Sequence, residues 1–337
     1  MDLFSTHTLL GIVQSLIISP QFFLTRYFPR VSMDESEEIH FDVIDKKRRL
    51  APFVSPVVAG RIVQSQGYTT QTFKPAYVKD KRVFRPRRAV KRMAGEGIGG
   101  TLSAAQRMIA LVAMDLQDQI DMIDRRLETM AVEAFRTGGV TVTGEGYPTQ
   151  NVNFGRAAGN TVVLTGVNRW NQSGVDPLDH LQEWSLMIAK ASGATPTDVI
   201  MDIDTWKVFR KNPAVIAWID RFKTTATLTP EAAIKQGATY MGQVDAYNIF
   251  VYIDWYVDDN GIEQPMLPSG TVIMAGSQIE GVRAFGAIED EDAGLQALEY
   301  FPKSWTEKDP AVRYLLMQSA PLVVPTRVNA SFCATVL

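Results

Sequence analysis

Residues 95–100 (GEGIGG) match the spacing G-x-G-x-x-G, which in dinucleotide-binding proteins brings backbone amides close to a pyrophosphate. That chemistry needs a buried apolar strand directly before the glycines and an acidic residue after a second strand about 20 residues later. Here the preceding residues are the basic run 87–92, and the acids at that distance fall inside one predicted helix. We therefore interpret residues 95–100 as a flexible joint, because glycine adopts backbone conformations that other residues avoid.

Acidic residues form a second candidate for chemistry, at a metal ion. Four of them are consecutive, from Glu289 to Asp292, but neighbouring side chains point in different directions, and we interpret the run as a solvated turn. Asp254, Asp258 and Asp259 flank a predicted hairpin, where turn chemistry explains them.

Histidine and cysteine give no further site. His7, His40 and His180 lie far apart, and the single cysteine, Cys333, adds no recognisable metal-ligand spacing. We expect Cys333 to be a small buried residue in a C-terminal strand, since one cysteine excludes an internal disulfide framework. We assign no catalytic, cofactor-binding or metal-binding residue and predict that the chain is not an enzyme.

The length and composition indicate a soluble globular protein of two or three domains. The chain has 337 residues, of which 46% are hydrophobic and 21% charged. Its most apolar stretch, residues 9–24, is interrupted by Gln14, Pro20 and Gln21 and lacks the flanks of a signal peptide or membrane helix. We expect an amphipathic helix that docks on another surface.

The charge is divided unevenly along the chain. Residues 46–92 contain 14 of the 34 basic residues and one acid, Asp80, which gives a net charge of +13. The remaining residues carry 20 basic and 36 acidic side chains, a net charge of −16. Such a chain is expected to meet a charged partner, either nucleic acid or the acidic surface of another copy. The basic segment lacks a recognised nucleic-acid motif, and we favour contact between copies.

The elements that position these residues follow from their patterns. Residues 61–73 and 76–84 are rich in β-formers and predict the two strands of a long charged hairpin, with residues 79–81 near a bend. Because such a hairpin is unstable alone, we expect it to extend from the body onto a partner.

The strongest helix signal covers residues 101–137. Apolar residues recur at alternating steps of 3 and 4 and form one stripe; they are Ala105, Ile109, Val112, Leu116, Ile120, Ile123, Leu127, Met130 and Ala134. Acids are predicted on the opposite face: Asp118, Asp121, Asp124 and Glu128. Thr101 or Ser103 can cap the start, and Gly138-Gly139 ends the helix.

The second half predicts mixed α/β structure. Residues 177–192 and 205–219 are predicted as helices, and residues 199–203, 247–257, 262–267, 272–275, 282–288 and 313–324 as strands. Asn260-Gly261 is a strong hairpin turn.

This arrangement, together with short sequence blocks, resembles the phage lambda major capsid protein family of tailed bacteriophages. The blocks are VSPVVAGRIV (54–63), FKPAYVK (73–79), TVTGEG (141–146), NFGR (153–156), GVRAFGAIED (281–290), YFPKSW (300–305), DPAVR (309–313) and MQSAPL (317–322). Each block is short, but their order and spacing are specific.

The resemblance implies the α+β Hong Kong 97-type capsid fold and the following division. Residues 1–45 would form an N-terminal arm, 46–95 an extended loop, 96–153 with 290–337 a peripheral domain containing the spine helix and C-terminal strands, and 154–289 a mixed α/β axial domain. The implied function is a major head protein whose hexamers and pentamers form an icosahedral shell enclosing double-stranded DNA. The alternatives are the shell of a non-viral nanocompartment, or a DNA-binding protein using residues 46–92.

The resemblance also implies partners. These are other copies of the chain, a decoration protein, scaffold and portal proteins from other genes during assembly, and packaged DNA in non-specific contact, with no membrane. The expected location is the virion, after assembly in the bacterial host cytoplasm.

Overall fold

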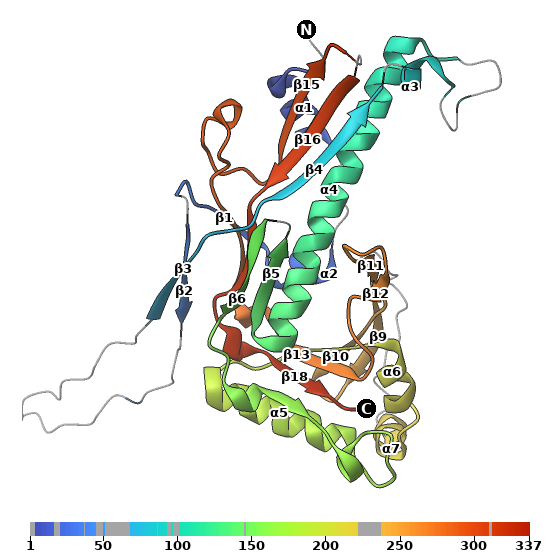
Figure 1. Ribbon diagram of the computed structural model, residues 1–337. Helices are drawn as coiled ribbons and strands as arrows, with labels where there is room; N and C mark the ends of the chain where they lie inside the picture. The colour runs from blue at the N-terminus through green and yellow to red at the C-terminus, as the bar shows by residue number, and fades with distance from the viewer. Residues whose placement is uncertain are drawn as a thin grey trace, which may run out of the picture.

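One long helix, α4 (Ala104–Thr137), runs along most of the elongated subunit, with sheets and shorter helices packed around it (Figure 1). The computed structural model describes residues 4–16, 21–36, 38–44, 50, 68–85, 87–92, 96, 101–144, 146–221, 237–309 and 312–337. Over its 34 residues, α4 is about 50 Å long at 1.5 Å per residue. The predicted spine helix is confirmed.

Both ends of α4 have the predicted signals. The hydroxyl of Ser103 accepts a hydrogen bond from the amide of Gln106, and the Gln106 side chain accepts one from the amide of Ser103, which completes a capping box. Gly138 ends the helix with φ +77°, in the left-handed region that glycine enters without steric cost. The next residue already belongs to a strand.

The predicted apolar stripe of α4 is buried from Val112 to Ala134, whereas Ile109 near the start is half exposed. The predicted acidic face is partly wrong: Asp118 is exposed, but Asp124 and Glu128 are buried. Protein packs on both sides of the helix over its second half, so a polar stripe there faces other elements instead of solvent.

Two small sheets and a hairpin lie along α4. The first sheet has the order β15 (Phe301–Glu307), β16 (Val312–Ser319), β4 (Val78–Phe84) and is entirely antiparallel. The second has the order β1 (Arg30–Met33), β14 (Gly281–Phe285), β17 (Pro321–Pro325), with β1 parallel to β14. The hairpin is β5 (Gly139–Gly144) with β6 (Tyr147–Asn153).

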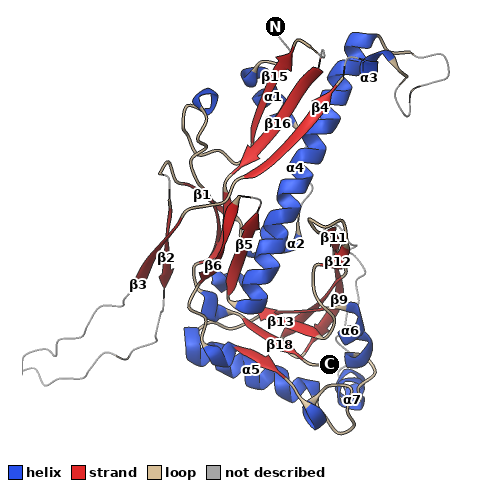
Figure 2. Ribbon diagram, viewed as in Figure 1, coloured by secondary structure: helices blue, strands red, loops and turns tan. Residues whose placement is uncertain are grey.

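A six-stranded mixed sheet lies beyond the C-terminal end of α4 (Figure 2). Its order is β7 (Thr161–Val163), β18 (Phe332–Thr335), β13 (Thr271–Ala275), β8 (Asp198–Met201), β10 (Tyr247–Tyr252), β9 (Ala238–Val244). The helices around it are α5 (Pro177–Ser192), α6 (Ile203–Phe209) and α7 (Pro213–Arg221). Short 3-10 helices are η1 (Ala158–Asn160), η2 (Gly166–Asn168), η3 (Ser277–Ile279), η4 (Glu291–Ala293) and η5 (Val328–Ala330). Because β18 pairs with β7 and β13, the C-terminus is part of this core.

The hairpin predicted from residues 61–73 and 76–84 is wrong in its pairing. Strand β3 (Tyr68–Phe73) pairs with β2 (Ile39–Ile44), while β4 pairs with β16, so residues 79–81 lie inside a strand. Two observations explain why β3 and β4 do not pair with each other. Pro75, between the two strands, is buried and lacks an amide donor. Arg82 of β4 instead forms an ion pair with Asp118 of α4. The β2–β3 hairpin, not a β3–β4 hairpin, projects from the body (Figure 1).

The N-terminal prediction of a helix that docks on another surface is also corrected. Residues 9–24 contribute to two helices, α1 (Thr6–Ser15) and α2 (Phe22–Tyr27), and both pack on this same chain. In α2, Phe22, Phe23, Leu24 and Tyr27 are buried. Among the described residues, no helix is long and apolar enough to span a membrane.

Several predicted elements of the second half are confirmed but subdivided. Helix 205–219 is split into α6 and α7 at Asn212-Pro213, since proline ends one helix and starts the next. The 247–257 strand is β10 followed by β11 (Trp255–Val257), which pairs with β12 (Glu263–Pro265) across the predicted turn, where Gly261 has φ +80°. The 313–324 strand divides between β16 and β17, and so connects two sheets.

Candidate assembly surfaces

The glycine-rich segment contributes one described residue, Glu96; the remainder of the joint prediction lies outside the described residues. The Glu96 carboxylate accepts hydrogen bonds from the Arg107 guanidinium, both at 2.9 Å, and from the Leu102 amide at 2.8 Å. Glu96 therefore ties the segment before α4 to the first turns of that helix. This is a structural contact, and sequence spacing did not indicate it.

The acidic run 289–292 forms a capped turn. Asp290 accepts a hydrogen bond from the Asp292 amide. The ammonium group of Lys303 forms ion pairs with Asp290 at 2.8 Å and with Asp292 at 2.7 Å. Burial alone would raise the pKa of Asp290, but the hydrogen bonds from Lys303 and from the Asp292 amide outweigh it, so the pKa lies below its ordinary value. Within the described part of the chain, no group of three or more His, Cys, Asp or Glu side chains could hold a metal ion.

The remaining residues singled out by type serve local structure. Asp258 accepts the amides of Asn260 and Ile262, which shapes the β11–β12 turn, and Asp259 pairs with Arg126 of α4. His180 accepts a hydrogen bond from the Trp170 indole at 3.0 Å. Cys333 is buried in β18, as predicted.

Part of the basic segment is neutralised within the chain. Arg82 of β4 pairs with Asp80 at 2.8 Å and with Asp118 of α4 at 2.7 Å. Arg88 of α3 (Arg87–Val90) donates to both oxygens of Asp115, at 2.6 and 3.1 Å. The preferred prediction, that this charge meets another copy, therefore does not apply to Arg82 and Arg88. Apart from Asp80 in the same strand, their acidic partners lie 27 and 36 positions away on α4, which strand periodicity does not reveal.

Glu128 joins three parts of the subunit at one buried carboxylate. Its oxygens accept hydrogen bonds from the amides of Phe23 (2.8 Å) and Leu24 (3.0 Å) and from the Tyr252 hydroxyl (2.9 Å). The first two donors are the unpaired amides at the start of α2, and the third belongs to β10. Burial raises the pKa of Glu128 to about 7, although these hydrogen bonds favour the ionised form.

A second carboxylate fixes the other end of α2. Asp198 of β8 accepts two hydrogen bonds from Arg26, at 2.6 and 2.9 Å, and one from the Tyr27 hydroxyl at 2.9 Å. Burial opposes ionisation, but the hydrogen bonds from Arg26 and Asn248 outweigh it, so the pKa of Asp198 is lowered. The short helix α2 thereby connects α4 to the six-stranded sheet.

Asp124 fixes the other side of α4. It accepts a hydrogen bond from the hydroxyl of Tyr300, which directly precedes β15. Burial raises the pKa of Asp124 to about 6, and the Tyr300 hydroxyl only partly offsets that effect. Together, Glu128 and Asp124 give α4 buried polar contacts to other elements on two of its sides.

The projecting hairpin is anchored where it leaves the body. Phe41 of β2 packs on Phe154 with ring centroids 5.7 Å apart, and Phe73 of β3 is buried. Beyond this apolar base, Thr70 donates to Asp42 across the strands at 2.6 Å on an exposed face. The described part of the hairpin is therefore held at its base by apolar packing and has a polar, exposed face beyond it.

The long helix α4, the projecting hairpin of β2 and β3, and the compact domain around the six-stranded sheet form a subunit suited to contacts with other subunits. In fold, this chain is similar to the putative capsid protein of a prophage of Escherichia coli CFT073. The two share a TM-score of 0.77 at 22% identity, over 99% of each chain. The capsid of Ralstonia phage GP4 has a TM-score of 0.56 at 12% identity, over 95% of this chain and 91% of that one. The fold is the Hong Kong 97-type capsid fold.

The chain belongs to the family "Phage major capsid protein E", whose model matches residues 5–336. It is 29% identical to the major capsid protein of Escherichia phage lambda over 334 residues and 30% identical to that of Enterobacteria phage P21 over 330 residues, with 96% of each chain covered. It is a structural capsid protein of a tailed bacteriophage and not an enzyme, and copies of it form the shell of the virion.

Proposed function

We propose that copies of this chain form hexamers and pentamers that close into an icosahedral shell around double-stranded DNA. The observation that carries the proposal is the elongated shape of the subunit, with the β2–β3 hairpin projecting to one side of α4 (Figure 1). Such a shape makes different contacts on its two edges, and repeated contacts between unlike surfaces close into rings. Many weak contacts then act together, which is how a shell gains stability from individually small energies.

We divide the subunit as the resemblance implies. The arm is residues 1–45, the extended loop 46–95, the peripheral domain 96–153 with 290–337, and the axial domain 154–289. Within that loop, β4 belongs to the sheet of β15 and β16, so the reach toward a neighbour comes from the β2–β3 side. The axial domain includes five strands of the six-stranded sheet, from β7 to β13 in the chain, and would surround the hexamer and pentamer axes.

The proposed partners follow from the work of such a shell. Scaffold and portal proteins would act during assembly in the cytoplasm of the bacterial host, and a decoration protein would bind the finished shell. Packaged DNA would make non-specific contacts with inward-facing basic residues, because phosphate contacts need charge and no sequence recognition.

Sedimentation of the purified chain tests this function. Shell assembly predicts particles of megadalton mass, and electron microscopy of the same fractions should show hollow spheres. A DNA-binding protein that uses residues 46–92 predicts a monomer or small oligomer that binds DNA in a salt-dependent manner. Finding that small species alone, at every protein concentration and salt concentration used, would contradict the proposal.

A further inference from the structure

A basic edge surrounds α3 at the N-terminal end of α4. Arg85, Arg87 and Lys91 are exposed, and none of them makes an ion pair with another residue that the structure describes. Between them, Val90 is 72% exposed. The neighbouring Arg88 holds the edge in place through Asp115 of α4, so this surface has a fixed position while its outward charges have no ion-pair partner among the described residues.

An acidic edge of similar design lies on two loops. Glu35, Glu38, Glu289 and Glu291 are exposed and likewise form no ion pair within the described part of the chain. Beside them, Leu295 is 60% exposed. Both loops are held in place by contacts at their bases. The Asp34 carboxylate accepts a hydrogen bond from the His40 amide at 2.9 Å, and Lys303 forms an ion pair with Asp290.

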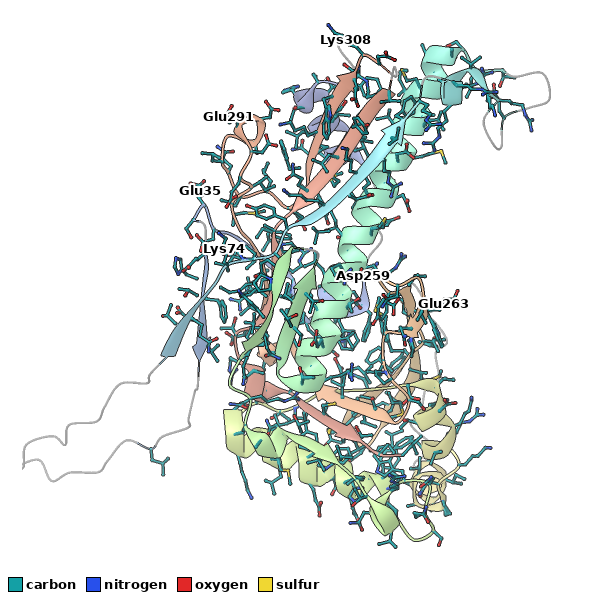
Figure 3. All side chains as sticks on the ribbon, viewed as in Figure 1. Glu35, Lys74, Asp259, Glu263, Glu291 and Lys308 are labelled. Carbon is teal, nitrogen blue, oxygen red and sulfur yellow. The ribbon has the colours of Figure 1, made fainter. Side chains whose placement is uncertain are left out.

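The two edges lie on opposite sides of the subunit. In Figure 3, Glu35 and Glu291 lie on the left of the upper half, and α3 is on the right of the same half, across the β15–β16–β4 sheet and α4. Neither edge can therefore satisfy the other within one chain. Two copies side by side, in the same orientation, bring the acidic edge of one toward the basic edge of the next.

We propose that the basic edge (Arg85, Arg87, Val90, Lys91) of one copy docks on the acidic edge (Glu35, Glu38, Glu289, Glu291, Leu295) of the adjacent copy. This pairing rests on the proposed shell function and assigns one of its contacts. Each edge has one exposed aliphatic side chain among like charges, so the contact has a small apolar centre with a charged rim, the usual anatomy of a protein interface.

Charge complementarity favours a second copy over nucleic acid as the occupant. A polyanion would neutralise the basic edge and leave the acidic edge, of comparable charge, without a partner. A copy of the same chain satisfies both edges at once and repeats the contact around a ring. Opposite charges across an interface also fix its register and exclude wrong neighbours, because juxtaposed like charges are strongly unfavourable.

Charge reversal tests the pairing. The first variant reverses all four glutamates of the acidic edge and so has two basic edges; its substitutions are Glu35→Lys, Glu38→Lys, Glu289→Lys and Glu291→Lys. The second variant reverses the three cations of the basic edge and so has two acidic edges; its substitutions are Arg85→Glu, Arg87→Glu and Lys91→Glu. Each variant should fold, because these side chains make no ion pair with another described residue, and melting of dissociated subunits should match the wild type. Each should fail to form particles in sedimentation. The chain with all seven substitutions has two complementary edges again and should recover assembly.

Mixing the two variants in equal amounts gives an independent measurement. Each contact between an all-basic copy and an all-acidic copy is attractive, so mixed oligomers should form and the mixture should sediment faster than either variant alone. A ring of five cannot alternate the two variants, so this measurement concerns association and not closure of the shell. The pairing is overturned if both variants assemble like the wild type, or if neither the sevenfold variant nor the mixture recovers association. A wild-type chain that never assembles would contradict the shell function together with this contact, whereas the first two outcomes contradict the contact alone.

Discussion

At the scale of single residues, the buried carboxylate of Glu128, which accepts three hydrogen bonds, makes the stability of the subunit depend on pH. Burial raises its pKa from an ordinary 4.5 to about 7. Between those values the folded chain retains a proton that the unfolded chain releases, so the free energy of unfolding falls as the pH rises through this window. The neighbouring acid Asp124, with a pKa of about 6, acts in the same direction.

Glu128→Gln should therefore weaken the pH dependence of stability. The wild-type subunit should melt at a lower temperature at pH 8 than at pH 5, with a loss on the order of 3 kcal/mol attributable to Glu128. A glutamine does not titrate and its carbonyl oxygen still accepts a hydrogen bond, so the variant should lose less stability than the wild type between pH 5 and pH 8. Calorimetry of dissociated subunits measures the difference, with Asp121→Asn on the same helix as the control. An unchanged pH slope in the glutamine variant would show that Glu128 does not titrate in this range.

At the scale of elements, the spine helix depends on a sharp C-terminal stop. A Cβ placed on Gly138 would lie 2.5 Å from the Cβ of Arg156, and the residue has φ +77°. Gly138→Ala should lower the free energy of unfolding by about 2–4 kcal/mol, since a steric clash adds to the cost of the left-handed backbone.

Gly146→Ala is the matched control for that substitution. Gly146 has a similar φ of +72°, but no atom lies within 4 Å of its added Cβ. It should therefore lose only the backbone cost, about 1 kcal/mol. Equal effects at the two positions in thermal melting would mean that the contact with Arg156 is unimportant.

The buried stripe of α4 gives a second prediction at this scale. Leu116 is fully buried, whereas Met122 on the same helix is 47% exposed. Leu116→Asp buries a charge without a partner, costs several kcal/mol and should give insoluble protein. Met122→Asp should remain soluble, because the Met122 sulfur already faces the Arg82 guanidinium at 3.2 Å. The soluble fraction after expression compares the two, and equal solubility would show that the buried face is misassigned.

These elements also show how far the sequence predicts the structure. The spine helix, its caps, the β11–β12 turn and the buried Cys333 all follow from spacing within about 40 neighbouring residues. The role of β4 and the burial of Glu128 do not, because their partners are more than 100 positions away. The pairing of β2 with β3 does not either, because a strand pattern alone does not say which other strand pairs with it. The periodicity of a helix shows which of its faces is apolar, but it does not show whether other elements of the protein also cover the polar face.

At the scale of the whole molecule, the charge asymmetry of the sequence is resolved in two ways. Arg82 and Arg88 are neutralised by acids of α4, and the outward charges of α3 remain for a neighbouring copy. The subunit thus uses part of its basic segment to stiffen itself and part to recognise another copy. Exposed pairs of this second kind are screened beyond about 8–10 Å by salt, so shell formation should depend on ionic strength.

The central claim is that this single fold, repeated, closes into a shell. Electron cryo-microscopy of the megadalton fraction tests it most directly, because the symmetry of the particles is measured together with the fold of the subunit. The account predicts closed icosahedral particles with fivefold and sixfold capsomers, α4 running along each subunit, and the β2–β3 hairpin lying against a neighbour. Open sheets, tubes without fivefold vertices, or subunits whose hairpins contact no neighbour would contradict it.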